Sequence, residues 1–265
     1  MRISHIFLSP HLDDAALSCG GLIAHLTAQG HAVLVVTLCS GSPPVNASFS
    51  PFVANMHARW ALPHAEVVRL RRAEDTEALA LLAAEREDLD YLDAIYRMPE
   101  AYTSNERLFG RIAPTDPLEA QLQAPLTELA TRYPSATFYA PLAIGNHVDH
   151  QIAYQTAHTL ASQGIIVAYY EDFPYVAAPG ALEDRLAVLG NQTAFMPIAH
   201  AIDATLAQKL AAIAAYRSQI GMLFGDLAAM NASVMRYAAR VAPPGSNHGE
   251  RLWVDRTLKL GTTDR

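Results

Sequence analysis

The sequence has little cysteine and no long hydrophobic run. Only Cys19 and Cys39 occur among the 265 residues. Nothing therefore indicates a disulfide framework or an oxidising compartment, and we expect both to be small buried apolar residues. No apolar stretch reaches the about 18 residues that a transmembrane helix needs, and the apolar run at residues 3–8 is shorter than a signal-peptide core. We expect no membrane span and a cytoplasmic protein.

Basic residues are also few. The 19 Lys and Arg are outnumbered by 26 Asp and Glu, which gives a formal net charge of −7, and the densest basic cluster is only Arg69, Arg71 and Arg72. Nucleic-acid binding requires clustered cations that neutralise phosphates. The composition therefore predicts no nucleic-acid partner, whereas a small-molecule substrate and a homo-oligomer are compatible with it.

Short apolar runs alternate with segments of helical spacing. Residues 3–8 form an apolar run, residues 14–29 have apolar side chains at helical spacing, and residues 32–38 form a second apolar run. Strand, helix and strand within about 40 residues are typical of a βαβ unit with parallel strands. Further helices are predicted at about 67–85, 118–133, 147–162, 204–220 and 225–240, and further strands at about 136–141, 165–170, 195–199 and 252–254. Residues 88–95 are predicted to be a short strand followed by a loop.

Two segments interrupt this alternation. Residues 41–63 are rich in Gly, Pro, Ser and Asn and are predicted to be a long loop, and residues 99–117 are predicted to be an irregular insertion. The whole pattern predicts a single α/β domain over residues 1–265, a Rossmann-like three-layer sandwich with a mostly parallel sheet. Ligands of such sheets bind beyond the carboxyl ends of the strands. The loops to inspect are therefore 9–14, 40–63, 93–97, 141–150 and 171–175.

The first of these loops carries three ionisable residues. His11, Asp13 and Asp14 lie between a buried strand and a helix, where unpaired imidazole and carboxylate groups are costly to bury. His11 and Asp14 can point to one centre and suit a metal such as Zn²⁺. Asp13 would then stand beside the metal as a general base acting on water. In the structural alternative, Asp13 or Asp14 is the N-cap of the helix and His11 is its hydrogen-bonded partner.

A later loop carries two histidines at helical spacing. His147 and His150 are three residues apart at a predicted helix start, so both rings lie on one helix face. Because a catalytic zinc usually has three protein ligands and an open position, one of them would complete the set begun by His11 and Asp14. The other would hydrogen-bond a substrate carbonyl or protonate a leaving amine. Asp149 could fix the tautomer of a histidine from outside the coordination sphere.

These motifs resemble those of a known family. His11-Leu12-Asp13-Asp14 with Gly20-Gly21, together with Gly145-x-His147-Val148-Asp149-His150, is similar to motifs of the PIG-L/LmbE-like metal-dependent de-N-acetylases. Weaker similarities extend over most of the chain, at Arg71-x-x-Glu74, Tyr91-Leu92-Asp93, Tyr170 to Tyr175 and Tyr216-Arg217-Ser218-Gln219. The family often has Pro where this sequence has Leu12 and Val148, but neither side chain does chemistry.

The resemblance implies a role for each residue. His11, Asp14 and His150 would bind Zn²⁺, or another divalent metal such as Fe²⁺. Asp13 would be the general base, His147 would polarise the carbonyl or act as an acid, and Asp149 would be an orienting carboxylate. Arg71 and Asp93 fall where the family contacts substrate. Apart from the resemblance, Glu171 and Asp172, which follow the strand predicted at 165–170, could form a rim contact or a helix cap.

The resemblance therefore implies a zinc-dependent deacetylase that removes the N-acetyl group from an N-acetylglucosamine-type amino sugar or glycoside. A second hypothesis is an amidase acting on another N-acyl substrate, such as a glycopeptide or a thiol conjugate. A third is a non-catalytic Rossmann-like binding module with a structural metal. Asp13 argues against this binding module, because a structural zinc site with a closed coordination sphere does not need an additional carboxylate beside it.

Overall fold

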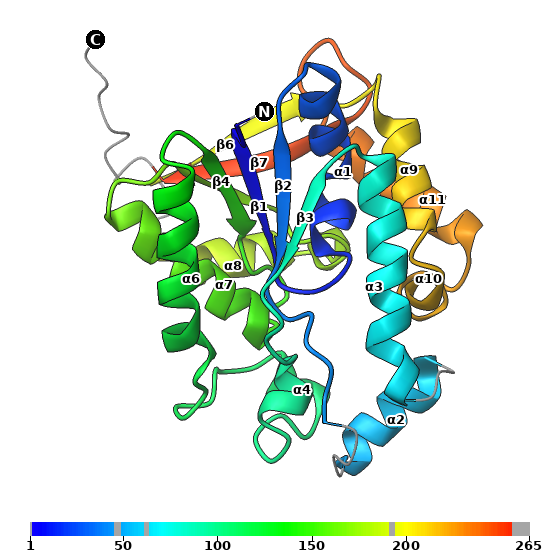
Figure 1. Ribbon diagram of the computed structural model, residues 1–265. Coiled ribbons are helices and arrows are strands. Elements are labelled where there is room, and N and C mark those ends of the chain that lie inside the picture. The colour runs from blue at the N-terminus through cyan, green and yellow to red at the C-terminus, as the bar shows by residue number, and fades with distance from the viewer. Residues whose placement is uncertain (1, 45–48, 61–63, 191–193, 256–265) are drawn as a thin grey trace.

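The computed structural model describes residues 2–44, 49–60, 64–190 and 194–255. Its centre is a seven-stranded sheet of order β3-β2-β1-β4-β5-β7-β6 (Figure 1). The strands are β1 (His5–Ser9), β2 (Val33–Thr37), β3 (Glu85–Asp88), β4 (Thr137–Pro141), β5 (Val167–Tyr170), β6 (Phe195–Ala201) and β7 (Gly249–Asp255). The pairs from β3 to β5 are parallel, whereas β7 pairs antiparallel with both β5 and β6. The predicted α/β fold with a mostly parallel sheet is confirmed.

Helices cover both faces of the sheet. On one face α1 (Asp14–Ala28), α3 (His64–Leu81) and α9 (Leu206–Ala214) pack together, and on the other α6 (Leu118–Arg132) packs on α7 (Val148–Ser162) (Figure 1). The remaining helical segments are α2 (Pro51–Trp60), α4 (Ala94–Arg97), α5 (Asn105–Leu108), η1 (Tyr175–Ala177), α8 (Ala181–Val188), α10 (Arg217–Leu223) and α11 (Leu227–Arg240). Three layers result, as the alternation of strands and helices predicts.

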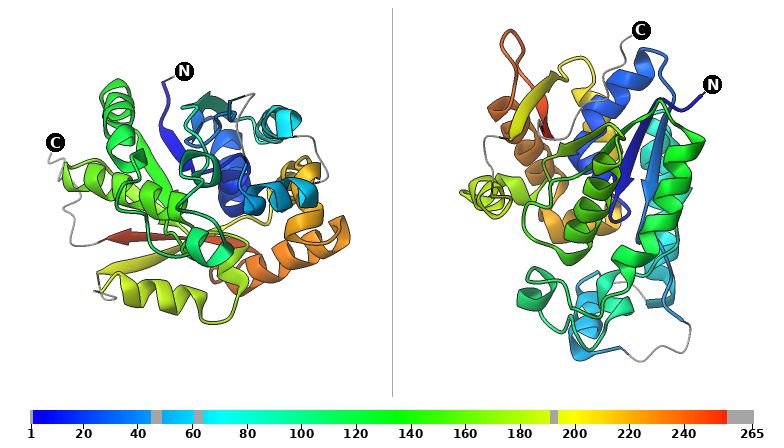
Figure 2. Two further views of the ribbon diagram at one scale, coloured as in Figure 1. Left: turned by 90° about the horizontal axis from the view of Figure 1, so that it is seen from below. Right: turned by 90° about the vertical axis from the view of Figure 1, so that its left-hand side faces the viewer.

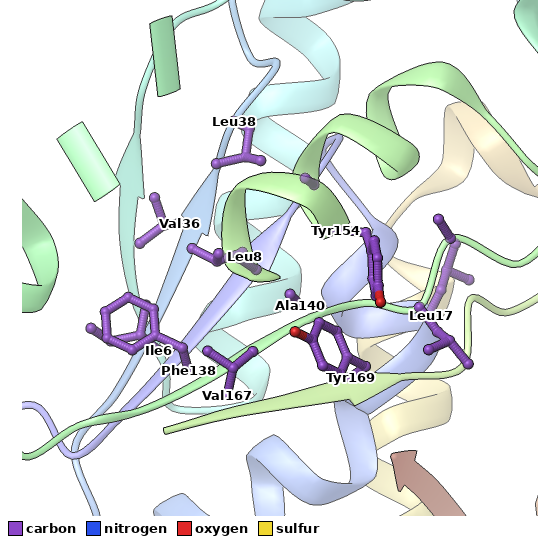
Figure 3. Packing of buried hydrophobic residues seen from close by; sticks show 14 of the residues in the cluster. Ile6, Leu8, Leu17, Val36, Leu38, Phe138, Ala140, Tyr154, Val167 and Tyr169 are labelled. Carbon is purple, nitrogen blue, oxygen red and sulfur yellow. The ribbon is translucent and has the colours of Figure 1, made fainter. Parts of the chain in front are cut away.

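The strands contribute to two cores, because successive side chains of a strand point to opposite faces of the sheet. In β1, Ile6 and Leu8 belong to the core that includes α6 and α7, whereas Phe7 belongs to the core that includes α1. Figure 3 shows the first core, where Ile6, Leu8, Val36 and Phe138 gather across three neighbouring strands. Burial of both faces explains why the strand sequences are apolar without alternation.

Two glycines let α1 approach its neighbours closely. A Cβ atom on Gly21 would lie 2.8 Å from side-chain atoms of Ile202, and one on Gly20 would lie 3.1 Å from Cγ of Lys209. Lys209 is itself buried and forms an ion pair of 2.6 Å with Glu250 of β7. Both cysteines are buried thiols, as expected.

The prediction of one long loop at residues 41–63 is wrong, because this segment contains α2. Residues 45–48 and 61–63 lie outside the described residues. Pro51 is the first residue of α2, a position where its fixed φ and missing N–H are favourable. Val53 is buried with Val67 of α3 and Ile95 of α4. A segment whose composition indicates a loop therefore contains the start of a helix and a side chain that belongs to the core.

Further elements differ from the prediction. The short strand predicted at the start of residues 88–95 lies earlier, as β3, and the loop predicted after it leads into α4. The helix predicted at 204–220 is divided into α9 and α10 at Tyr216, whose hydroxyl donates a hydrogen bond to Asp75 of α3 (2.7 Å). Tertiary contacts here override the helical spacing of the sequence. The structure also contains α8, where no helix was predicted.

The helices α2 and α4, which lie within the first irregular segment and just before the second, stand at one end of the sheet. α2 and α4 lie beyond the carboxyl ends of β1, β2 and β3 (Figures 1 and 2). They share a small core of their own with α5, and they therefore enclose the sheet edge where ligand-binding loops are expected. Within the described ranges, no helix has the length and apolar character to cross a membrane.

Candidate active site

Ser9, at the end of β1, caps α1 in place of the aspartates. Its Oγ accepts a hydrogen bond from the Ala15 N–H (3.0 Å) and donates one to the His11 carbonyl (2.6 Å). Asp13 occupies the N-cap position, but its side chain makes no capping hydrogen bond within the described residues. Its φ of 135° is rare for a non-glycine residue and costs of order 1–3 kcal/mol. The capping alternative therefore does not describe Asp13, whose carboxylate is free for another role.

His11, Asp14 and His150 come together at the carboxyl ends of β1 and β4. His11 Nδ1 lies 3.2 Å from Asp14 Oδ2, and His150 Nε2 lies 3.3 Å from the same oxygen. His150 Nε2 is buried and has no hydrogen-bond partner in the part of the chain that the structure describes. Such an atom is costly, and a divalent cation would satisfy it. Two imidazole nitrogens and a carboxylate fit Zn²⁺.

Two other groups of donors have ligand atoms within 4.8 Å of one another in the described ranges: His11, His147 and His150, and His11, Asp93 and Asp149. Both oxygens of Asp149 are engaged in hydrogen bonds to protein groups. His147 Nδ1 lies 3.2 Å from the Asp149 N–H, which donates to it. Asp14 Oδ2, which contacts both His11 and His150, also accepts a hydrogen bond from the His11 N–H (2.8 Å). Either Asp14 or His147 could therefore complete a three-ligand set with His11 and His150.

Each candidate histidine ligand has a carboxylate on the far side of its ring. His150 Nδ1 lies 2.7 Å from Asp172 Oδ1, and His11 Nε2 lies 3.0 Å from Asp149 Oδ2. Contacts of this kind fix the tautomer and make the opposite nitrogen a better metal ligand. The Asp149 carboxylate thus orients His11, whereas only its backbone N–H contacts His147.

Asp149 is held by a buried arginine. Arg97 Nη2 lies 2.6 Å from Asp149 Oδ1, and Arg97 also donates two hydrogen bonds of 2.8 Å to Asp116. The side chains of these three residues are at most 6% exposed. Burial alone would raise the pKa of Asp149, but Arg97 and His11 hold it well below its usual range. Asp149 is therefore an anion, and its orientation depends on Arg97.

Arg71, from α3, reaches the Asp13 carboxylate. Its Nη2 lies 3.4 Å from Asp13 Oδ2 and donates a hydrogen bond to the Leu12 carbonyl (3.0 Å). Burial raises the pKa of the Asp13 carboxyl to about 7, and Arg71 opposes this rise. A carboxyl group that titrates near neutrality is suited to take a proton from water and to return it.

His147, the N-cap of α7, is held in one tautomer. Because Nδ1 accepts the hydrogen bond from the Asp149 N–H, the proton of the neutral ring is assigned to Nε2. Burial, reinforced by the charge of His11, lowers the pKa of His147 well below its usual range. The ring is therefore neutral, and its Nε2–H can donate a hydrogen bond to a carbonyl oxygen.

A cavity of about 430 Å³ opens over these groups. Its polar lining includes His11, Asp13, Asp14, Arg71, Asp93 and His147, and two of these, Arg71 and Asp93, are the residues predicted to contact substrate. His150 is only 1% exposed and is not part of the lining. Its apolar lining comes from α1, α2, α5, η1, α10 and the residues next to α5 and η1: Leu17, Met56, Leu108, Phe109, Pro174, Tyr175, Met222 and Leu223.

Sequence reasoning missed two residues that support the site. Asp172 was expected at a rim or a cap, yet it is 1% exposed and holds His150. Its position two residues after the end of β5, a buried parallel strand, was the signal that could have identified it. Arg97 lies in a loop that the sheet-edge rule selects, but nothing in the sequence connects it to Asp149.

Comparison with known proteins gives consistent matches. The sequence profile of the PIG-L family, described as GlcNAc-PI de-N-acetylase, matches residues 6–161. A 2'-N-acetylparomamine deacetylase of Niallia circulans is 32% identical over an alignment 245 positions long, which covers 83% of this chain and 82% of the relative.

Two solved structures share the whole architecture. The A40926 pseudoaglycone deacetylase matches with a TM-score of 0.73 and 27% identity, over 96% of this chain and 97% of that chain. The zinc-inhibited form of a teicoplanin deacetylase matches with a TM-score of 0.76 and 25% identity over the same shares. With the profile match covering both predicted motifs, the chain belongs to the PIG-L family of de-N-acetylases.

Proposed function

We propose that this chain is a metal-dependent hydrolase that removes the acetyl group from an N-acetylated amino sugar or glycoside of the N-acetylglucosamine type. The observation that carries the proposal is Asp13, a buried carboxylate released from helix capping by Ser9 and placed beside His11 and Asp14 in the cavity lining. The activities of the relatives, which are deacetylases of amino-sugar compounds, support it.

His11, Asp14 and His150 would hold the metal, for which we propose Zn²⁺, with Fe²⁺ as the alternative. When bound, the metal supplies Lewis acidity that polarises the acetyl carbonyl and acidifies water. The unpartnered Nε2 of His150 and the shared contact with Asp14 Oδ2 support this assignment.

Asp13 moves the proton. As a general base it takes a proton from the attacking water while the oxygen of that water bonds to the acetyl carbon. When the carbon–nitrogen bond breaks, Asp13 returns the proton to the leaving nitrogen, and the products are acetate and a free amine. Arg71 orients the Asp13 carboxylate through the 3.4 Å contact.

His147 stabilises the charge that develops on the acetyl oxygen. Its neutral Nε2–H donates a hydrogen bond there, and a preformed donor of this kind strengthens as negative charge builds up. The Asp149 N–H keeps the ring in the donating tautomer. Asp149 itself therefore acts by positioning His11 and His147.

The other polar residues of the cavity would bind the sugar. Arg71 and Asp93 both line the cavity and offer a donor and an acceptor to ring hydroxyl groups. We also infer that the deacetylase domain spans residues 1–265, because β5, β6 and β7 complete the sheet beyond the matched residues 6–161.

A second candidate substrate is an N-acyl group on a glycopeptide. The observation that favours it is the apolar part of the cavity lining, which includes Phe109, Tyr175 and Met222. A cavity with an apolar wall suits a substrate with an apolar substituent.

Acetate release and metal content test the proposal together. We expect purified protein to hold about one metal per chain and to release acetate from N-acetylglucosamine glycosides. Asp13→Asn should retain the metal and lower kcat by about 10²–10⁴-fold, whereas His150→Ala should lower metal retention. Because a related deacetylase has a zinc-inhibited form, zinc is titrated from below one equivalent.

Asp203→Asn, which alters an exposed carboxylate paired with His248, is the control and should leave both readouts unchanged. Undiminished acetate release by Asp13→Asn would contradict the mechanism. Hydrolysis of acylated glycopeptides without hydrolysis of simple glycosides would select the second candidate.

A further inference from the structure

The first turn of α10 is attached to α3 through a buried carboxylate. Glu74, only 1% exposed, accepts hydrogen bonds from the Ser218 N–H (2.9 Å) and from Ser218 Oγ (2.6 Å). A carboxylate is stabilised at a helix N-terminus, where backbone N–H groups lack partners within the helix. Glu74 therefore fixes both the position and the rotation of the start of α10.

A second buried contact holds the residue before α10. The Tyr216 hydroxyl donates a hydrogen bond to Asp75 Oδ1 (2.7 Å), and both side chains are 2% exposed. Glu74 and Asp75 follow Arg71 by about one helical turn of α3. The same stretch of α3 that reaches Asp13 through Arg71 thus also positions α10.

This attachment orients the amide of Gln219. Ser218 Oγ gives its proton to Glu74, so it can only accept from the Gln219 side chain, whose Nε2 lies 2.9 Å away. The hydrogen-bond network therefore identifies the nitrogen and the oxygen of this amide. The assignment follows from the Glu74 carboxylate, which can only accept hydrogen bonds, so that the Ser218 hydroxyl must donate to it.

The carbonyl oxygen of Gln219 is left without a partner. The residue is 3% exposed and belongs to the lining of the cavity. Its Oε1 accepts no hydrogen bond from the described residues and is not among the fully enclosed unpartnered atoms, so it retains some exposure in a side chain that lines the cavity. A buried side chain with an oriented, unsatisfied acceptor is uncommon unless a ligand uses it.

We propose that Gln219 is a substrate-binding residue whose Oε1 accepts a hydrogen bond from a hydroxyl group of the amino sugar, with Glu74 and Ser218 as positioning residues. This inference rests on the proposed function and adds a sugar contact on the α10 side of the cavity. A neutral amide suits a hydroxyl group, because it can bind that donor without adding charge beside Asp13 and Asp14.

The central test uses Gln219→Met, which retains an unbranched side chain of similar length without the acceptor. We expect KM for an N-acetylglucosamine glycoside to rise about tenfold, the effect of losing one neutral hydrogen bond, with kcat and metal content close to those of the wild type. In the inactive Asp13→Asn background, the same substitution should weaken glycoside binding by a similar factor in calorimetry.

Deoxy analogues of the glycoside identify the contact. The wild type should bind one of these analogues about tenfold more weakly than it binds the parent glycoside. Gln219→Met should bind that analogue and the parent glycoside equally well, because the hydroxyl group missing from the analogue is the partner of the acceptor missing from the variant. Glu74→Gln should raise KM in the same direction without changing metal content. If Glu74→Gln lowered only the melting temperature, its positioning role would be wrong.

Arg217→Ala is the matched control. Arg217 also lies on α10 and bridges to α3 through Glu77, but both side chains are at least 50% exposed, so kinetics should not change. If the wild type releases acetate and Gln219→Met has an unchanged KM, this inference is wrong and the proposed function stands. If the wild type releases no acetate from any amino sugar, the proposed function is wrong, and the inference about Gln219, which rests on it, is wrong with it.

Discussion

Asp172 Oδ1 lies 2.7 Å from Nδ1 of His150, and Nε2 on the other side of that ring is the buried nitrogen without a hydrogen-bond partner in the described ranges. The second oxygen of Asp172 accepts the Ile144 N–H (2.9 Å). One carboxylate thus holds both the loop after β4 and the histidine that follows it. The orientation of His150 depends on a residue that lies outside the matched family region of 6–161.

Asp172→Asn should weaken metal binding by about 10–100-fold, the usual effect of losing a carboxylate behind a histidine ligand. At saturating metal, kcat should recover to near the wild-type value, because Asp172 does not line the cavity. Competition with a chelator measures the affinity. Asp203→Asn, which alters the exposed His248 pair, is the control. Unchanged metal affinity in Asp172→Asn would show that Asp172 does not support a metal ligand.

The sequence predicted the residues that meet at the candidate metal site because each follows a buried strand. His11 and Asp14 come after one strand and His150 after another, and parallel strands bring such loops to one edge. The support behind them was not predictable in this way. Arg97 contacts Asp149 only because the segment around α4 folds over the sheet end, and no local pattern encodes that contact.

Arg97→Met should lower the free energy of unfolding by about 3–5 kcal/mol, because it leaves the buried carboxylates of Asp116 and Asp149 without their cation. Urea unfolding measures this loss. Arg217→Ala removes an exposed ion pair with Glu77 and should cost less than about 1 kcal/mol. Similar losses in both variants would mean that the buried arginine is not needed to compensate the two carboxylates.

Helical spacing located α1 and α7 correctly, because their apolar residues pack against the sheet over the full helix length. It joined α9 to α10, because the Ala-rich sequence around Tyr216 continues the same spacing. The helix ends there because the Tyr216 hydroxyl reaches Asp75, a contact over 141 positions of sequence. Periodicity describes which face is buried, and it does not describe where a distant partner interrupts a helix.

Gly145→Ala should lower both stability and kcat/KM. Gly145 has a φ of 88°, and an added Cβ would lie 2.8 Å from Cβ and Cγ of Tyr175, which lines the cavity. Gly164→Ala is a matched control, since its φ is 93° but no atom lies within 4 Å of the added Cβ. Both should lose about 1–2 kcal/mol from backbone strain. Only Gly145→Ala should lose further stability and lower kcat/KM, because only its added Cβ would displace Tyr175.

Asp75 is a buried carboxylate whose two oxygens differ. Oδ1 accepts the Tyr216 hydroxyl, whereas Oδ2 lies 3.2 Å from Arg86 Nε but has no hydrogen-bond partner among the residues described. Burial raises the pKa of Asp75 to about 6, and the contacts to Tyr216 and Arg86 only partly oppose this rise. The folded protein therefore binds the Asp75 proton more tightly than the unfolded chain does.

Ionisation of Asp75 should reduce stability as the pH rises from about 4 to about 6, because a raised pKa in the folded state favours the neutral form. A difference of about two pH units corresponds to at most about 3 kcal/mol. Asp75→Asn cannot ionise, so its free energy of unfolding relative to wild type should grow by up to that amount between pH 4 and pH 7. Urea titrations at each pH measure this difference. For Asp184→Asn, at an exposed position, the difference in the free energy of unfolding from wild type should not change with pH. A difference for Asp75→Asn that does not change with pH would contradict the prediction.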